Sequence, residues 1–244
     1  MLSTQEECFK LNHGVWMKHS DLVHKRHPNA SVVTTNIATF FFGGFWSRDT
    51  YEYLPHDSNE WMIGQTKIPG GLKDGFAIAV KSGQEIWLIG GFDTEKRILS
   101  FNVNDHSFKE LPINLIVERW GHNCAFIPGT NKVMITGGGD EKATRGSNSS
   151  EILDIETGVV TLANPMNRIR LFHGMGTTML DGENRVVVFS DNRIQKAIEF
   201  YDTKAKKWKI TNQIKMRKEM HVLNYLTLNL WEIQRLFSKP DTPR

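Results

Sequence analysis

Three histidines recur at nearly regular intervals, and they are the residues of this chain best suited by type to bind a metal ion. His122, His173 and His221 are separated by 51 and 48 residues. Spacing this regular indicates equivalent positions in successive structural units, which lie too far apart for three imidazoles to meet one ion at ~2.1 Å. We therefore expect structural histidines that bond to neighbouring loop backbone, and no metal site.

Arginines gather in short polar segments between apolar runs, where they could recognise an anionic group. The guanidinium group binds carboxylates and phosphates in bidentate fashion, and arginine is enriched at binding hot spots. The alternative is a set of solvated charges compensated by nearby acidic residues such as Asp49, Asp93 and Asp140. The arginines that we predict to bind a partner are Arg48, Arg97, Arg119, Arg145, Arg170 and Arg193.

Composition and charge exclude several other classes of protein. The 244 residues carry 30 Lys+Arg against 27 Asp+Glu, and a net charge of +3 does not favour nucleic-acid binding. The lysines between residues 204 and 209 fit the protection of a sheet edge better than a nucleic-acid site. Cys8 and Cys124 are too few for a disulfide framework or a four-thiolate zinc site.

The sequence shows neither a membrane span nor a targeting signal. Its longest apolar runs fall well short of the ~20 residues that a spanning helix needs. The first residues, MLSTQEECFKLNHG, lack a basic region followed by an apolar one. We therefore expect a cytoplasmic protein that does not bind membranes. The alternative is a secreted domain, for which Asn29 and Asn148 would be N-glycosylation sites.

The elements that must position these side chains are short strands. Apolar runs of four to seven residues, rich in β-branched and aromatic types, alternate with turn residues, and helical spacing is absent before residue 214. Three runs end in a glycine doublet, and the doublets at Gly43, Gly90 and Gly137 are 47 residues apart. A fourth run ends in Ser190 and Asp191 at a spacing of 53. The chain is therefore an all-β repeat protein.

Further residues recur in register with the doublets. A bulky residue near the end of the next strand is followed by a second one five to eight positions later. These pairs are Tyr53/Trp61, Val103/Phe108, Ile155/Val160 and Tyr201/Trp208. A period near 50 fits four strands per unit, with the bulky pair buried between neighbouring sheets. The doublets allow positive φ and close backbone approach near the centre of the ring.

With these motifs the chain resembles the kelch-repeat β-propeller family. The resemblance rests on the glycine doublets, on the Tyr53/Trp61 and Tyr201/Trp208 pairs, and on the basic-x-x-His openings at residues 119–122, 170–173 and 218–221. It covers about residues 26 to 228 and departs from the family pattern at Ser190, Phe108 and Val160. It implies an all-β, kelch-type propeller of four-stranded antiparallel blades, with about four recognisable blades and partial end strands.

The phase of the repeat predicts the bounds of the units. Complete blades are expected at about 29–70, 72–115, 117–166 and 168–216, inside a propeller domain of 1–228. Residues 8–22 are expected to form one outermost strand, residues 218–228 a first strand, and residues 229–244 a C-terminal tail. These two end strands leave a fifth blade incomplete.

The resemblance implies a protein-interaction module rather than an enzyme. In kelch folds the loops after the doublets share one face with the segments that lead into each blade, so the predicted arginines would converge there. The implied partner is a protein or an acidic peptide, and ubiquitin-ligase components if the chain belongs to a longer adaptor. Neither a cofactor nor a catalytic residue is expected.

The alternative from the same family is a carbohydrate-active enzyme, either an oxidase or an epimerase that acts on sialic acids. Copper oxidases of this scaffold use tyrosines, histidines and a Cys-modified tyrosine. Tyr51, Tyr53 and Tyr201 already fit structural strand positions, and neither cysteine lies in a comparable motif. An extracellular recognition domain is the third reading.

Overall fold

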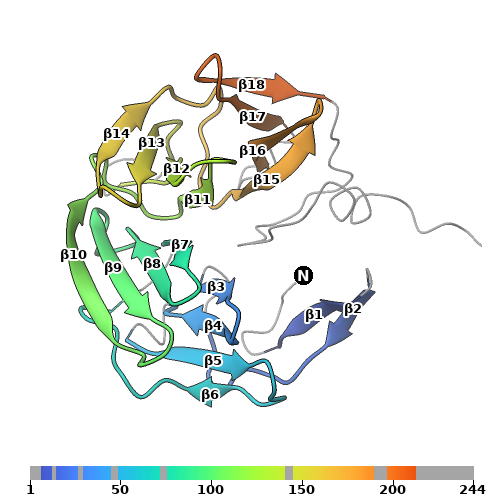
Figure 1. Cartoon of the computed structure of the whole chain (residues 1–244), viewed down its shortest axis with the longest axis vertical. Helices are drawn as coiled ribbons and strands as arrows, with labels where there is room; N and C mark the ends of the chain where they lie inside the picture. The colour runs from blue at the N-terminus through green and yellow to red at the C-terminus, as the bar shows by residue number, and fades with distance from the viewer. Residues whose placement is uncertain are drawn as a thin grey trace, which may run out of the picture.

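The structure, a computed structural model, describes residues 7–12, 15–26, 30–44, 49–71, 76–140, 145–189 and 197–212. These residues form strands and turns and contain no helix. Their four four-stranded antiparallel sheets stand around a ring, which is a four-bladed β-propeller (Figure 1). The predicted fold class is confirmed.

Each blade uses four consecutive strands, and Figure 1 shows the first strand nearest the middle of the ring and the last on its rim. The strands of blades 1 and 2 are β3 (Ser31–Thr34), β4 (Ala38–Phe42), β5 (Tyr51–Pro55), β6 (Met62–Ile63), β7 (Ala77–Ser82), β8 (Glu85–Ile89), β9 (Arg97–Asn102) and β10 (Phe108–Asn114). Those of blades 3 and 4 are β11 (Asn123–Phe126), β12 (Lys132–Thr136), β13 (Ser150–Asp154), β14 (Val160–Ala163), β15 (Gly174–Leu180), β16 (Glu183–Phe189), β17 (Ile198–Asp202) and β18 (Lys207–Thr211).

The hydrophobic core lies in the seams between neighbouring blades. Strand residues alternate between two faces, so each inner strand sends one set of side chains to each neighbour. Blades 1 and 2 share an aromatic seam in which the rings of Phe42 and Phe101 lie 5.1 Å apart. Trp87 and Val133 belong to the seam between blades 2 and 3, and Met134 and Trp208 to the seam between blades 3 and 4. Each blade therefore completes the core of the next.

The glycine doublets adopt the backbone conformation that the sequence predicts. The first glycine of each has a positive φ, of 62° at Gly43, 60° at Gly90 and 65° at Gly137. A Cβ atom on Gly137 would lie 2.8 Å from Cε1 of His173 and 2.9 Å from the carbonyl oxygen of Arg170. A side chain is thus excluded both by φ and by the next blade.

The N-terminal residues differ from the expectation of one outermost strand. They form two short strands, β1 (Phe9–Asn12) and β2 (Val15–Lys18), which pair as an antiparallel hairpin beside blade 1 (Figure 1). Asn12 pairs with Val15 at one end of this hairpin, and Phe9 pairs with Lys18 at the other. The expected strand at 218–228 and the tail at 229–244 lie outside the described residues.

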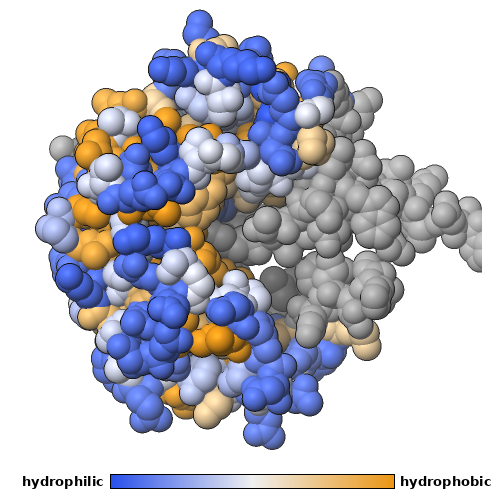
Figure 2. Space-filling view, in the orientation of Figure 1, coloured by the Kyte–Doolittle hydropathy of each residue, from blue (hydrophilic) through white to orange (hydrophobic). Residues whose placement is uncertain are grey.

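Hydrophilic residues cover most of the face seen in Figure 2, and hydrophobic residues form separate patches on it. Several of the exposed apolar side chains belong to outermost strands, such as Leu162 of β14 at 64% and Ile210 of β18 at 46% exposure. Exposed apolar residues that occur singly are usual on soluble proteins. A cluster of exposed apolar residues in a fixed position, in contrast, indicates a binding surface.

Candidate functional site

Two sets of connections meet on one face of the ring, which we call the loop face. The first set joins the second and third strands of a blade, and the second consists of the lead-in segments between consecutive blades. Gly91 donates its N–H to the carbonyl of Arg119 over 3.1 Å, and Gly138 donates to that of Arg170 over 3.0 Å. Trp120 and Gly139 exchange backbone hydrogen bonds of 2.9 and 2.8 Å. The loop of one blade is thus fastened to the lead-in segment of the next, and in blade 3 the loop is also fastened to the lead-in segment of its own blade.

Two of the predicted partner-binding arginines, Arg119 and Arg170, lie in the interior. Nη2 of Arg119 is 2.7 Å from Oε1 of Glu151 on β13, and Nη2 of Arg170 is 2.9 Å from Oε1 of Glu199 on β17. No side chain of these two pairs is more than 1% exposed. Burial lowers the pKa of Arg119, and the Glu151 carboxylate opposes that shift. The expectation that these two arginines face a partner is wrong.

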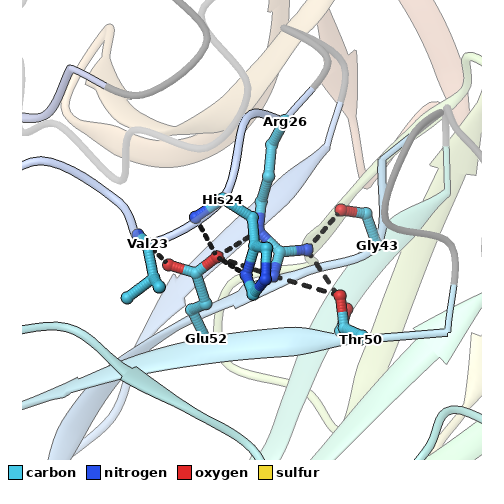
Figure 3. A network of polar contacts seen from close by, with 6 residues as sticks. All are labelled: Val23, His24, Arg26, Gly43, Thr50 and Glu52. Atoms are coloured by element: carbon cyan, nitrogen blue, oxygen red, sulfur yellow. Dashed lines mark hydrogen bonds and ion pairs between the residues drawn. The ribbon is translucent and has the colours of Figure 1, made fainter.

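A third pair of this kind joins Arg26 and Glu52, and the sequence analysis missed it (Figure 3). Glu52 accepts the N–H groups of Val23 and His24 over 2.7 and 3.0 Å as well as two hydrogen bonds from Arg26. Nη1 of Arg26 donates to the carbonyl of Gly43 over 2.6 Å. The signal that could have found it is a glutamate at one repeated position of an otherwise apolar third strand.

In blades 1 and 3 the pair ties three parts of the blade together. Glu151 also accepts the N–H groups of Ile116 and Val117, both over 2.9 Å, and Nη1 of Arg119 donates to the Gly137 carbonyl over 2.6 Å. A lead-in segment, a third strand and a glycine doublet are therefore joined by one buried ion pair. Removing one partner of such a pair strands a buried charge, at a cost of about 3–5 kcal/mol.

Blade 2 replaces this arrangement with neutral groups. Leu99 pairs with Leu88 of β8 at the register that Glu151 and Ile135 occupy in blade 3, and it is 1% exposed. The Gly90 carbonyl instead accepts a hydrogen bond of 2.9 Å from Oγ1 of Thr94 in the following loop. Residues 72–75, which lead into blade 2, lie outside the described residues.

The four other predicted arginines have different positions. Arg97 begins β9, is 20% exposed, donates to the Pro69 carbonyl and lies 3.5 Å from the Glu110 carboxylate. Arg145 is exposed in the loop between β12 and β13. Arg48 and Arg193 lie outside the described residues. Of the six predicted arginines, Arg145 is thus the one that the structure places openly on the loop face.

Aromatic residues that the sequence analysis did not assign to the site lie on the loop face. The ring centroid of Trp120 is 5.7 Å from that of Phe92 and 5.6 Å from that of Phe172. Phe92 follows a glycine doublet and is 40% exposed, whereas Trp120 and Phe172 come from the lead-in segments of blades 3 and 4 and are half-buried. We call these three side chains the aromatic row. The sequence signal for this row was the aromatic residue inside two of the three basic-x-x-His openings, those at residues 119–122 and 170–173.

Two of the three recurring histidines lie in the part of the chain that the structure describes. His122 and His173 are buried, and Cε1 of His122 lies against Gly90 of the preceding blade. Burial, aided by the Arg119 charge, lowers the pKa of His122 to about 3, and burial beside Arg170 lowers that of His173 well below its ordinary value. Nε2 of His173 bonds to Oγ1 of Thr136 over 2.9 Å. Nδ1 of His173 has no hydrogen-bond partner among the described residues, so this ring does not make the expected bond to loop backbone. At His122 a backbone hydrogen bond with Ile89 opposes the lowering of the pKa. His221 lies outside the described residues.

Within the described ranges, no three His, Cys, Asp or Glu side chains are grouped so that they could hold a metal ion. No helix of that part of the chain is long and apolar enough to cross a membrane. Nδ2 of Asn148 donates to the Met166 carbonyl over 3.1 Å, and Asn29 lies outside the described residues.

A comparison with protein-family models and a comparison with curated proteins find no match to this chain.

Proposed function

We propose that this chain is a kelch-type propeller that acts as a protein-interaction module and binds a peptide or loop of a partner protein on its loop face. The binding is an equilibrium recognition in the cytoplasm without covalent chemistry. The observation that carries the proposal is the gathering of one exposed and two half-buried aromatic side chains on that face, which also carries exposed Arg145. Tryptophan and arginine are the residue types most enriched at binding hot spots.

The frame beneath the face supports the same conclusion. The loops and lead-in segments are bonded to each other, and the buried pairs Arg119–Glu151 and Arg170–Glu199 hold the lead-in segments to their blades. A rigid support lowers the ordering cost of binding, because fewer groups lose freedom when the partner docks. A substrate-adaptor role in a ubiquitin ligase is a more specific form of this proposal. It needs a further domain that recruits the ligase.

The test is a pull-down that compares two charge reversals. The full chain is immobilised as wild type, as Arg145→Glu on the loop face, and as Lys109→Glu on β10 at the rim. Both side chains are exposed, so neither change should affect folding. We expect proteins retained by the wild type and by Lys109→Glu to be lost from Arg145→Glu. Retention of the same proteins by all three forms would contradict a role for the loop face.

A further inference from the structure

The aromatic row holds one of its members in a strained conformation. Phe172 has a φ of 52°, in the left-handed region that bulky residues rarely adopt. Such a residue costs on the order of 1–3 kcal/mol and persists only where its surroundings fix it. Its N–H donates to the Gly121 carbonyl over 2.7 Å, so the backbone of blade 4 is drawn back onto the lead-in segment of blade 3.

A glycine makes room for the strained ring. A Cβ on Gly121 would lie 3.0 Å from Cε1 of Phe172 and 2.7 Å from Cδ1 of Leu171, and Gly121 itself has a φ of 63°. The ring of Phe172 thus lies over bare backbone and extends the surface of Trp120. The positive φ of Phe172 and the missing side chain of Gly121 together hold this half-buried ring on the loop face.

Charge differs between the two ends of the row. Phe92 is followed by Asp93, whose N–H bonds to the Glu95 carboxylate over 3.1 Å, so this end is acidic. At the other end a Cβ on Gly146 would lie 3.0 Å from Cβ of Leu171, so exposed Arg145 and Phe172 are the sequence neighbours of two residues in contact. Exposed Arg168 lies four residues before Phe172. Opposite charges on a bound segment would therefore fix its direction.

We propose that the aromatic row is the docking site for an extended partner segment with an aromatic or prolyl side chain and a carboxylate at its Phe172 end. Flat apolar rings pack on aromatic faces, and extended or polyproline segments lose little entropy on docking. The two centroid steps of 5.7 and 5.6 Å allow a span of at most about 11 Å, or up to three to four extended residues at ~3.3 Å each. The acidic residue should therefore follow or precede the first ring by at most three or four positions.

This inference rests on the proposed function, and a peptide selection tests it separately. Phage-displayed random twelve-residue peptides are selected on the full chain. The Kd of each enriched peptide is then measured for the wild type, Phe92→Ser, Phe172→Gly and the control Leu162→Ser, an exposed apolar residue of rim strand β14. Phe172→Gly also relieves the strain, so a loss of binding without a loss of thermal stability separates recognition from folding.

We expect enriched peptides to carry the ring and the acid at the stated spacing. Kd should rise at least about tenfold in Phe92→Ser and Phe172→Gly and stay within twofold in Leu162→Ser. Enriched peptides that lack this pattern, or that bind all variants alike, would overturn the aromatic row while leaving an interaction module elsewhere on the ring. A selection that enriches nothing, together with a pull-down that retains nothing, would overturn both proposals.

Discussion

The buried carboxylates of this ring depend on several partners at once. Glu151 accepts two backbone N–H groups and two bonds from Arg119, and all of these become unpaired if the carboxylate is removed. We expect Glu151→Ala to lower the free energy of unfolding by about 3–5 kcal/mol. Chemical denaturation measures the change. Glu110→Ala, at a carboxylate 60% exposed near Arg97, should cost less than about 1 kcal/mol.

The Leu99 arrangement of blade 2 suggests the control for that prediction. Replacing both Arg119 and Glu151 by leucine removes the stranded charge, although the backbone N–H groups stay unpaired. The double variant should therefore be more stable than Glu151→Ala alone. If both variants lose the same unfolding free energy, the unpaired Arg119 charge has no cost. The stability lost would then come from the carboxylate's hydrogen bonds to the backbone.

Histidine burial gives the fold a dependence on pH. The pKa of His122 is about 3 in the folded chain, below the ~6.5 of an exposed imidazole, so the unfolded chain binds this proton first as pH falls. Stability is therefore full above about pH 6.5 and declines between there and about pH 3. His122→Leu removes this buried titratable ring and should flatten the decline. Denaturation curves at pH 7 and pH 5 give the loss of unfolding free energy over this range. An equal loss in the wild type and in His122→Leu would contradict the assignment.

At the scale of the element, the glycine doublet joins two blades, since its missing side chain makes space for the histidine of the next one. Gly137→Ala combines a φ of 65° with contacts of 2.8 and 2.9 Å, the latter to backbone. We expect a loss of more than about 2 kcal/mol in the free energy of unfolding. Gly129→Ala is the matched control, because its φ is 72° and nothing lies within 4 Å of its Cβ.

That control isolates the cost of backbone conformation, about 1 kcal/mol. The difference between the two variants then measures how closely the blades approach one another. Thermal unfolding of both variants in the same buffer gives this difference directly. Similar melting temperatures for Gly129→Ala and Gly137→Ala would show that the loop gives way and that the doublet is needed for its φ alone.

For the whole molecule, the sequence predicted the architecture because a repeat multiplies weak signals. One glycine pair is uninformative, but three pairs with a period of 47 identify a ring of sheets. The hairpin of β1 and β2 was missed because its pattern occurs once and has no second copy to support it. Repeated patterns were predictable, and single departures from them were not.

The candidate site was predicted less well, for a physical reason. A charged residue in a lead-in segment looks exposed in the sequence, and only the glutamate on the third strand shows that Arg119 and Arg170 point inward. The neighbouring Trp120 looks like a core residue by type, yet it stays half-buried at the loop face while Arg119 beside it occupies the interior. Which of two adjacent side chains is buried depends on a partner about 30 residues away in the chain.

The buried Arg119–Glu151 pair and its hydrogen bonds to backbone also fix where one unit of this ring ends and the next begins. Glu151 bonds to residues 116, 117 and 119, all before the first strand of its own sheet. A graft of β11–β14 alone into another propeller would omit residues 116, 117 and 119. The Glu151 carboxylate would then be buried without its hydrogen-bond partners. Recombination or protein engineering that exchanges whole units should therefore cut ahead of residue 116, and natural exon borders that preserve function would be expected to respect the same limit.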